Sequence, residues 1–237
     1  MTKLEIEKLL TESLGLKKPP IALKPLKTIP KDIPAYEGVA TPGFCVQINE
    51  ILQNGSVFYS TRENHGCYEA LIATGACAVD RKEYREAVEN FIDICPYHKD
   101  MDTAMDFYET CIRDIPLPPV EYACLASGPL GKIDNPDLVL LFCNPKQADI
   151  LVRSQAYQGT LVRGFGGNGG CIFNIRHAFV SRQMTFSTSD FPWRSFVGLD
   201  DSELTVTFPY EKLVEAAPYI QPIIDYVDSL KEVFSTN

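Results

Sequence analysis

The sequence predicts an α+β (mixed α/β) protein, a sheet with helices packed on it, folded as a single domain over residues 1–237. Two observations carry this prediction. Helical and strand-like hydrophobic patterns mix throughout the 237 residues, and no internal repeat or low-complexity tract stands out among them. Hydrophobic residues make up 45% of the chain, which is long enough to bury a core of its own. If the domain has two lobes, the proline-rich stretch near 113–120 is the expected break between them.

The first half of the chain predicts five helices and two strands. Thr2 and Glu5 form a capping-box pattern ahead of an amphipathic helix that ends near Gly15. Prolines limit the next strand to residues 21–23, and the Asn54-Gly55 turn precedes a strand over 56–60. The remaining helices are expected over residues 45–52, 67–74, 81–94 and 101–112.

The second half begins with two apolar runs, 122–126 and 138–142, which predict buried strands. The other elements follow from hydrophobic period and from glycine and proline positions. Strands are expected over 158–163, 184–188 and 204–208, and helices over 145–154, 171–179 and 221–233.

The chain carries 22 basic and 31 acidic residues, a net charge of −9, and its basic clusters are short. Nucleic acid and anionic membrane are therefore excluded as expected partners. No apolar run reaches the length of a transmembrane helix, and the charged N-terminus lacks the apolar stretch of a signal peptide. We expect a cytoplasmic protein, in a reducing compartment where its eight cysteines stay free of disulfides.

Three of the cysteines share one local setting. Cys45, Cys67 and Cys171 each follow glycine closely and each open a predicted helix. The N-terminus of a helix stabilises a thiolate, and neighbouring glycine lets the backbone approach a bound group. The pattern predicts an iron–sulfur site, with 4Fe–4S the expected cluster, and its sulfurs should lie within about 6–7 Å of one another given metal–thiolate bonds near ~2.3 Å. Core packing is the alternative interpretation for each cysteine.

Three ligands leave one iron of a cubane open, so it could act as a Lewis acid or redox centre. His65, Cys77 or a small molecule are candidates for the fourth position, and His177 is a further candidate ligand. The other cysteines are expected to be structural. Cys124 and Cys143 lie in or beside apolar strand runs and should be buried and without a ligand. Cys111 lies within a predicted helix, and Cys95 ends a predicted helix beside a proline.

The glycine run over 164–169 matches G-x-G-x-x-G, and Asp190 follows about 20 residues later, as in a dinucleotide fingerprint. The match comes late in the chain, with little sequence left to complete a doubly wound sheet. We expect the run to serve the cysteine site instead, because Gly170 directly precedes Cys171. Backbone N–H groups of Gly166, Gly169 and Gly170 would then face the cluster.

Three arginines follow this run, at positions where they could bind an anionic ligand. The more favoured interpretation places them at the surface or in ion pairs with acidic neighbours. The arginines are Arg176, Arg182 and Arg194, and the acids are Asp190, Asp200 and Asp201.

From about residue 20 to 230 the chain resembles the family called domain of unknown function 169, found in archaea and anaerobic bacteria. The matching stretches are Phe44-Cys45, Thr61 to Cys67 with Gly75, Gly128-Pro129-Leu130, 136–141, 145–148, Gly170-Cys171 and 200–203 leading to Pro209. The resemblance implies that Cys45, Cys67 and Cys171 are the family's cysteines. The match is loose at Pro192-Trp193-Arg194. The family carries no established activity.

Three functional hypotheses remain open. The leading one is an iron–sulfur or other metal-binding protein that meets a small-molecule ligand or an electron-transfer partner. The second is a nucleotide-dependent oxidoreductase that uses the 164–169 loop. The third is a non-catalytic thiol sensor or small-ligand binding protein. Whether the protein is an enzyme, and whether it forms a homo-oligomer, is left open by the sequence.

Overall fold

The computed structural model describes residues 1–38, 43–78, 80–92, 98–115, 118, 122–166 and 170–235. Its centre is a seven-stranded sheet. The strands are β1 (Ile21–Leu26), β2 (Phe58–Ser60), β3 (Cys124–Pro129), β4 (Leu138–Cys143), β5 (Gly164–Gly166), β6 (Thr185–Ser187) and β7 (Leu204–Pro209). They lie in the order β2-β3-β1-β4-β7-β6-β5, and β5 and β6 run parallel while the other described neighbours are antiparallel. The predicted α+β class is confirmed.

Nine α-helices and three other helical segments are described around the sheet. The segments are the π-helices η1 (Leu9–Ser13) and η3 (Gly170–Arg176) and the 3-10 turn η2 (Leu130–Lys132). The α-helices are α1 (Lys3–Lys8), α2 (Phe44–Asn54), α3 (Tyr68–Thr74), α4 (Arg81–Ile92), α5 (Met101–Asp114), α6 (Pro145–Ala156), α7 (His177–Ser181), α8 (Phe191–Val197) and α9 (Tyr210–Ser235).

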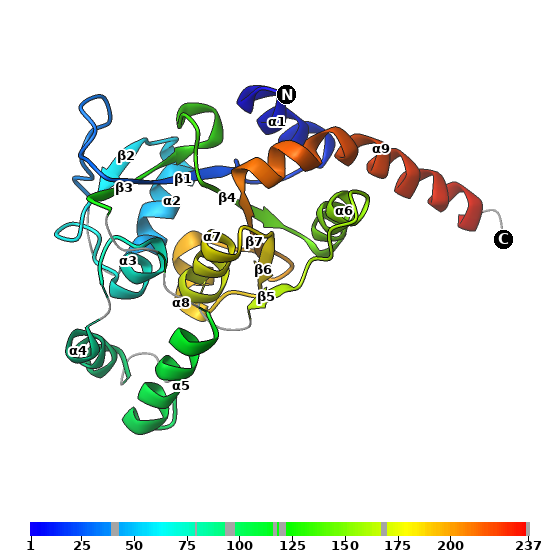
Figure 1. Cartoon of the computed structure of the whole chain (residues 1–237). Coiled ribbons are helices and arrows are strands. Elements are labelled where there is room, and N and C mark those ends of the chain that lie inside the picture. Colours follow the sequence, from blue (N-terminus) through cyan, green and yellow to red (C-terminus); the bar gives the residue numbers. More distant parts are fainter. Residues whose placement is uncertain are drawn as a thin grey trace.

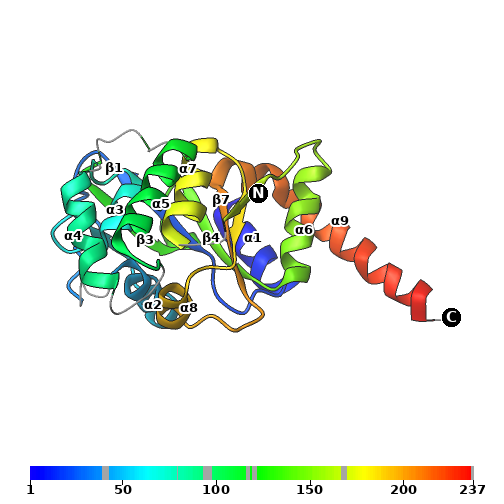
Figure 2. The same ribbon diagram turned by 90° about the horizontal axis from the view of Figure 1, so that it is seen from below.

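Helices cover both faces of the sheet (Figures 1 and 2). On one face α1, η1, α6 and α9 bury a core that includes Ile6, Leu151 and Leu213. On the other face α2, α3, η3, α7 and α8 pack around Phe44, Ile175 and Trp193. All three cysteines of the predicted site belong to this second face.

The central strand β4 shows why both faces are buried. Val139 and Leu141 point into the first core, whereas Leu138, Leu140 and Phe142 point into the second. Side chains of a strand alternate between faces, so a continuous apolar run serves two cores at once. The expected strand over 138–142 is thus confirmed with its burial.

The helices α4 and α5 lie side by side at the end of the molecule opposite α9, which projects from the body toward the C-terminus (Figures 1 and 2). With α3 they enclose a third, smaller core that includes Tyr84 and Tyr108. Among the described residues, no helix combines the length and apolar character needed to cross a bilayer.

The structure corrects several expected elements. The strand expected over 158–163 is wrong, because the pairing residues are Gly164–Gly166, within the glycine run itself. Helix α8 was not expected, and α9 begins at Tyr210, well before the expected residue 221. Of the 113–120 break, residues 116–117 and 119–120 lie outside the described residues, as does Cys95.

Candidate functional site

The three glycine-flanked cysteines all lie at helix starts, as predicted. Cys45 is the second residue of α2, Cys67 is the N-cap of α3, and Cys171 is the second residue of η3. Since α3 packs directly on η3, the beginnings of these helices meet on one face of the sheet.

Gly43 brings the start of α2 against the start of α3. Its φ of 128° lies in a region that side chains rarely adopt, and an added Cβ would lie 2.7 Å from the Cβ of Cys67. With glycine there, the backbone N–H of Phe44 reaches the sulfur of Cys67, and the N–H of Ala70 reaches it from α3. Two free N–H groups at helix starts therefore converge on one sulfur.

The sulfurs of Cys67 and Cys171 share a hydrogen bond. This bond, together with the two backbone N–H groups, lowers the pKa of Cys67 below that of an ordinary thiol. The same bond and burial raise the pKa of Cys171 well above its ordinary value. The hydrogen bond therefore separates the pKa values of the pair, and Cys67 is the cysteine whose thiolate form it favours.

Cys45 lies in the electrostatic field of both partners. Burial first, and then the negative charge on Cys67, raise the pKa of Cys45 strongly. Cys45 also contributes to the raised pKa of Cys171. The three sulfurs thus form one interacting group, which we call the cysteine triad. In the part of the chain described, however, no three His, Cys, Asp or Glu side chains are spaced as a metal site.

The aromatic rings of Phe44 and Trp193 belong to the same core cluster as the three cysteines. The Phe44 ring stacks on His65 with centroids 5.0 Å apart and lies 6.2 Å from the Trp193 ring. His65 is fully buried, burial lowers its pKa to about 4, and neither ring nitrogen has a hydrogen-bond partner. His65 is therefore a buried neutral imidazole whose two ring nitrogens have no hydrogen-bond partner in the described structure.

Two carboxyl groups belong to the same environment. Burial and the neighbouring Asp190 raise the pKa of Glu69 to about 7, and Arg176 acts in the opposite direction. Asp190 also raises the pKa values of Cys45 and Cys171. Its carboxylate caps α8 by accepting from the Trp193 N–H at 2.7 Å. Neither acid was among the candidate ligands expected from the sequence.

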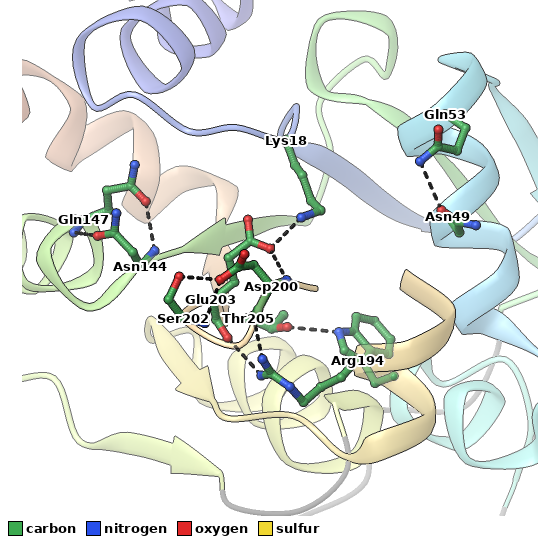
Figure 3. A network of polar contacts seen from close by, with 11 residues as sticks. Lys18, Asn49, Gln53, Asn144, Gln147, Arg194, Asp200, Ser202, Glu203 and Thr205 are labelled. Atoms are coloured by element: carbon green, nitrogen blue, oxygen red, sulfur yellow. Dashed lines mark hydrogen bonds and ion pairs between the residues drawn. The ribbon is translucent and has the colours of Figure 1, made fainter. Parts of the chain in front are cut away.

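A polar network fixes α8, which packs on α2, to the strand β7 and the turn before it (Figure 3). The indole of Trp193 donates to Thr205 Oγ1 at 2.9 Å. The Arg194 guanidinium donates to the carbonyls of Thr188, Glu203 and Asp200. Arg194 thus ties α8 to the turn before β7 through three main-chain carbonyls and not through an ion pair with an acidic neighbour.

The remaining cysteine and histidine candidates lie outside the triad. Cys124 and Cys143 are fully buried in the sheet, as expected, and burial raises the pKa of each. Cys77 packs in the third core with Tyr84 and Met105, away from the triad. His177 lies on α7 beside Gly164 and not among the three sulfurs.

The first residues of the glycine run form β5, the edge strand of the sheet, before the chain continues to Cys171. At Gly164 an added Cβ would lie 2.6 Å from the Cβ of Thr185, so this glycine allows β5 to approach β6. Gly166 ends β5 and Gly170 begins η3, whereas Gly169 lies outside the described residues. The largely antiparallel sheet also differs from the parallel, doubly wound sheet of dinucleotide-binding folds.

Arg176 corrects a further expectation. The favoured interpretation placed it at the surface or in an ion pair, but it is fully buried between η3 and α5. Arg182 does pair at the surface, with Glu211.

A family model, DUF169, described as an uncharacterised ArCR, matches residues 9–218. No match was found among curated proteins or among solved structures.

Proposed function

The chain belongs to the DUF169 family, and we propose that it binds an iron–sulfur cluster through Cys45, Cys67 and Cys171. The observation that carries this proposal is the cysteine triad itself, in which a hydrogen bond joins two of the sulfurs and the third interacts with both. Each sulfur comes from a different helix start, where dipoles and free N–H groups favour negative charge.

The protonation of the triad suits a site that is completed by metal. Iron binds thiolates, and the lowered pKa of Cys67 favours that form. The raised pKa values of Cys45 and Cys171 follow from burial and from neighbouring negative charge. A bound cation reverses that effect, so cluster binding would release the thiol protons of Cys45 and Cys171.

Two further features support a cluster. His65 is a buried neutral imidazole whose nitrogens lack partners, which makes it the candidate for the fourth ligand. Of the glycines expected to donate backbone N–H groups to the sulfides, Gly166 ends β5 and Gly170 directly precedes Cys171 at the start of η3. If a small molecule takes the fourth position in place of His65, that iron would supply Lewis-acid or redox chemistry to it.

The test is anaerobic purification, followed by iron and acid-labile sulfide assays on the wild type and on Cys171→Ser. We expect both elements in the wild type and their loss from the variant. Cys111→Ser, on α5, is the matched control, because it changes a buried cysteine outside the triad. A wild-type protein that holds neither iron nor sulfide after anaerobic reconstitution would end the proposal.

The direct bond between Cys67 and Cys171 favours a second candidate, a dithiol sensor. With a small disulfide as oxidant, the Cys67 thiolate would attack one sulfur and release a small thiolate. Cys171 would then lose its proton and displace a second small thiolate, which closes an intramolecular disulfide. Alkylation and mass spectrometry after exposure to glutathione disulfide would detect that bond in metal-free protein.

A further inference from the structure

A cavity of about 340 Å³ lies between α5 on one side and β5, η3 and α7 on the other (Figure 2). Its wall includes Phe107 and Asp114 from α5, Phe173 from η3, His177 from α7, and Arg163 just before β5. Among the described residues that line it, none is a cysteine of the triad. The volume lies near the lower end of the range of small-ligand pockets, roughly 300–1,000 Å³, which favours a compact ligand over a dinucleotide.

The charged groups of the cavity leave one cation unmatched. Among the described residues of its wall, Asp114 and Arg163 carry charge. The Asp114 carboxylate accepts from Arg113 Nε at 3.0 Å, so its charge is already balanced. Arg163 forms no ion pair with any residue that the structure describes. The cavity therefore favours an anionic group, and a guanidinium presents its donors in pairs that match the two oxygens of a carboxylate.

His177 supplies a hydrogen-bond acceptor. The Ser181 hydroxyl donates its one proton to the His177 carbonyl at 2.6 Å, so its oxygen can only accept from His177 Nδ1, 3.4 Å away. The ring proton is therefore favoured on Nδ1, and burial lowers the pKa of His177, which keeps the imidazole neutral. The lone pair is then on Nε2, to which no described residue donates. A ligand beside His177 is favoured if it carries a hydrogen-bond donor.

Two phenylalanine rings give the cavity an apolar wall. The Phe107 and Phe173 rings have centroids 5.7 Å apart and planes inclined by 55°. Both side chains are half-buried, and both line the cavity from opposite sides of the contact between α5 and η3. Aromatic side chains at such angles offer faces and edges to a further ring, so this wall favours a flat aromatic body.

We propose that this cavity binds a small aromatic carboxylate that carries a hydroxyl group on its ring. The carboxylate accepts from Arg163, the ring packs against the two phenylalanines, and the hydroxyl donates to His177 Nε2. All of these side chains line one cavity, so a single occupant has access to each of them. Binding uses neither a metal nor the cysteine triad, and the inference therefore goes beyond the proposed cluster.

The experiment is calorimetric titration of metal-free wild-type protein with sodium 4-hydroxybenzoate, for which we expect saturable binding. Benzoate lacks the hydroxyl and should bind about fivefold more weakly, as expected for the loss of one hydrogen bond. Phenol lacks the carboxylate and should bind more weakly by about tenfold or more, because hydrogen bonds to a charged group are the stronger ones.

Two variants assign the contacts. Arg163→Met should weaken 4-hydroxybenzoate binding by about tenfold or more, and it should keep the fold because Arg163 is exposed. Arg153→Met is the matched control, since Arg153 is an exposed arginine of α6 that pairs with Asp149, and it should bind as the wild type does. His177→Phe keeps a ring in the wall and removes the acceptor, so it should bind 4-hydroxybenzoate and benzoate equally.

Three results would overturn the proposal. The first is the absence of saturable 4-hydroxybenzoate binding by the wild type. The second is phosphate binding at least as tight as that of 4-hydroxybenzoate, which would assign the cavity to an inorganic anion. The third is an unchanged preference for 4-hydroxybenzoate over benzoate in His177→Phe, which would place the hydroxyl away from His177. All of these titrations use metal-free protein, so their outcome is independent of whether a cluster binds.

Discussion

Cys171 donates a hydrogen bond to the sulfur of Cys67 across the contact between η3 and α3. Two distant parts of the chain thus hold two buried sulfurs in contact, and their hydrogen bond lowers the pKa of Cys67 and raises that of Cys171. Such a pair can serve as two ligands of a metal site, or it can be oxidised to a disulfide. The role of the third sulfur, that of Cys45, distinguishes these two functions. A cluster of the proposed kind uses Cys45, whereas a disulfide between Cys67 and Cys171 does not.

The first prediction uses that difference. Cys45→Ser should lose most of the iron and sulfide, because it removes one of three proposed ligands. It should still form the disulfide between Cys67 and Cys171 when the metal-free protein is oxidised. Metal analysis and thiol counting on one preparation measure both. Full iron content in Cys45→Ser would exclude Cys45 as a ligand.

Gly43→Ala should damage the triad through the backbone. Gly43 has φ 128°, and the new Cβ would lie 2.7 Å from the Cβ of Cys67. Backbone strain of this kind costs about 1–3 kcal/mol, and relief requires α2 to move from α3. We expect lower stability in chemical denaturation and loss of iron.

Gly55→Ala is the control for that variant. Gly55 also has positive φ, 62°, but an added Cβ would be 3.6 Å from the nearest atom, Lys132 Nζ. It should cost about 1 kcal/mol of stability and leave the iron in place. Equal iron loss in both variants would show that strain anywhere in α2 disturbs the site.

Cys124 and Cys143 should tolerate substitution. Both are fully buried in the sheet, where burial raises their pKa and keeps the thiols inert. Replacement by alanine should cost roughly 1–2 kcal/mol of unfolding free energy and leave the metal content unchanged. Loss of iron from either variant would mean that the ligand set was assigned wrongly.

Gly170→Val should weaken cluster retention while it preserves the fold. Gly170 begins η3 directly before Cys171, so a branched side chain would crowd the backbone that faces the triad. Release of iron to a chelator, followed over time, measures retention. Saturable NADH binding by metal-free wild type that disappears in Gly166→Val would instead favour the nucleotide-dependent oxidoreductase.

Local signals predicted most of the fold, and failed where tertiary structure overrides them. Pro25 led us to end a strand at residue 23, yet β1 continues to Leu26. β4 pairs with β1 only over Ile21–Leu23, so Pro25 needs no N–H on that side. Pro218 and Pro222 similarly led us to expect the last helix only from residue 221, although α9 already begins at Tyr210.

The site was likewise predictable only where its signals are local in the sequence. Glycine before Cys45, Cys67 and Cys171 is a local signal for a helix start, and each helix begins there. Burial of Arg176 depends on α5, far away in the sequence, and no local pattern encodes it. Helix α8 could have been found, because Asp190 and Pro192 form a cap and first-turn pattern that we did not use.

Trp193 should report on the triad. It is the only tryptophan in the chain, it is fully buried, and its ring lies 6.2 Å from that of Phe44, the neighbour of Cys45. An iron–sulfur cluster absorbs light over the range of tryptophan emission, so a cluster at the triad would receive excitation energy from the indole. We therefore expect anaerobic reconstitution to quench Trp193 fluorescence in proportion to the iron bound.

Zinc provides the control for this quenching, because Zn²⁺ binds thiolates but has no visible absorption. Zinc should leave most of the Trp193 emission intact. A loss of fluorescence would then report an iron–sulfur cluster and not merely a metal ion bound at the triad. The Thr205→Val variant removes the acceptor of the indole N–H, and should shift the emission without changing the iron content. If iron binds in full while Trp193 fluorescence is unchanged, the cluster lies away from α8 and the triad is not its site.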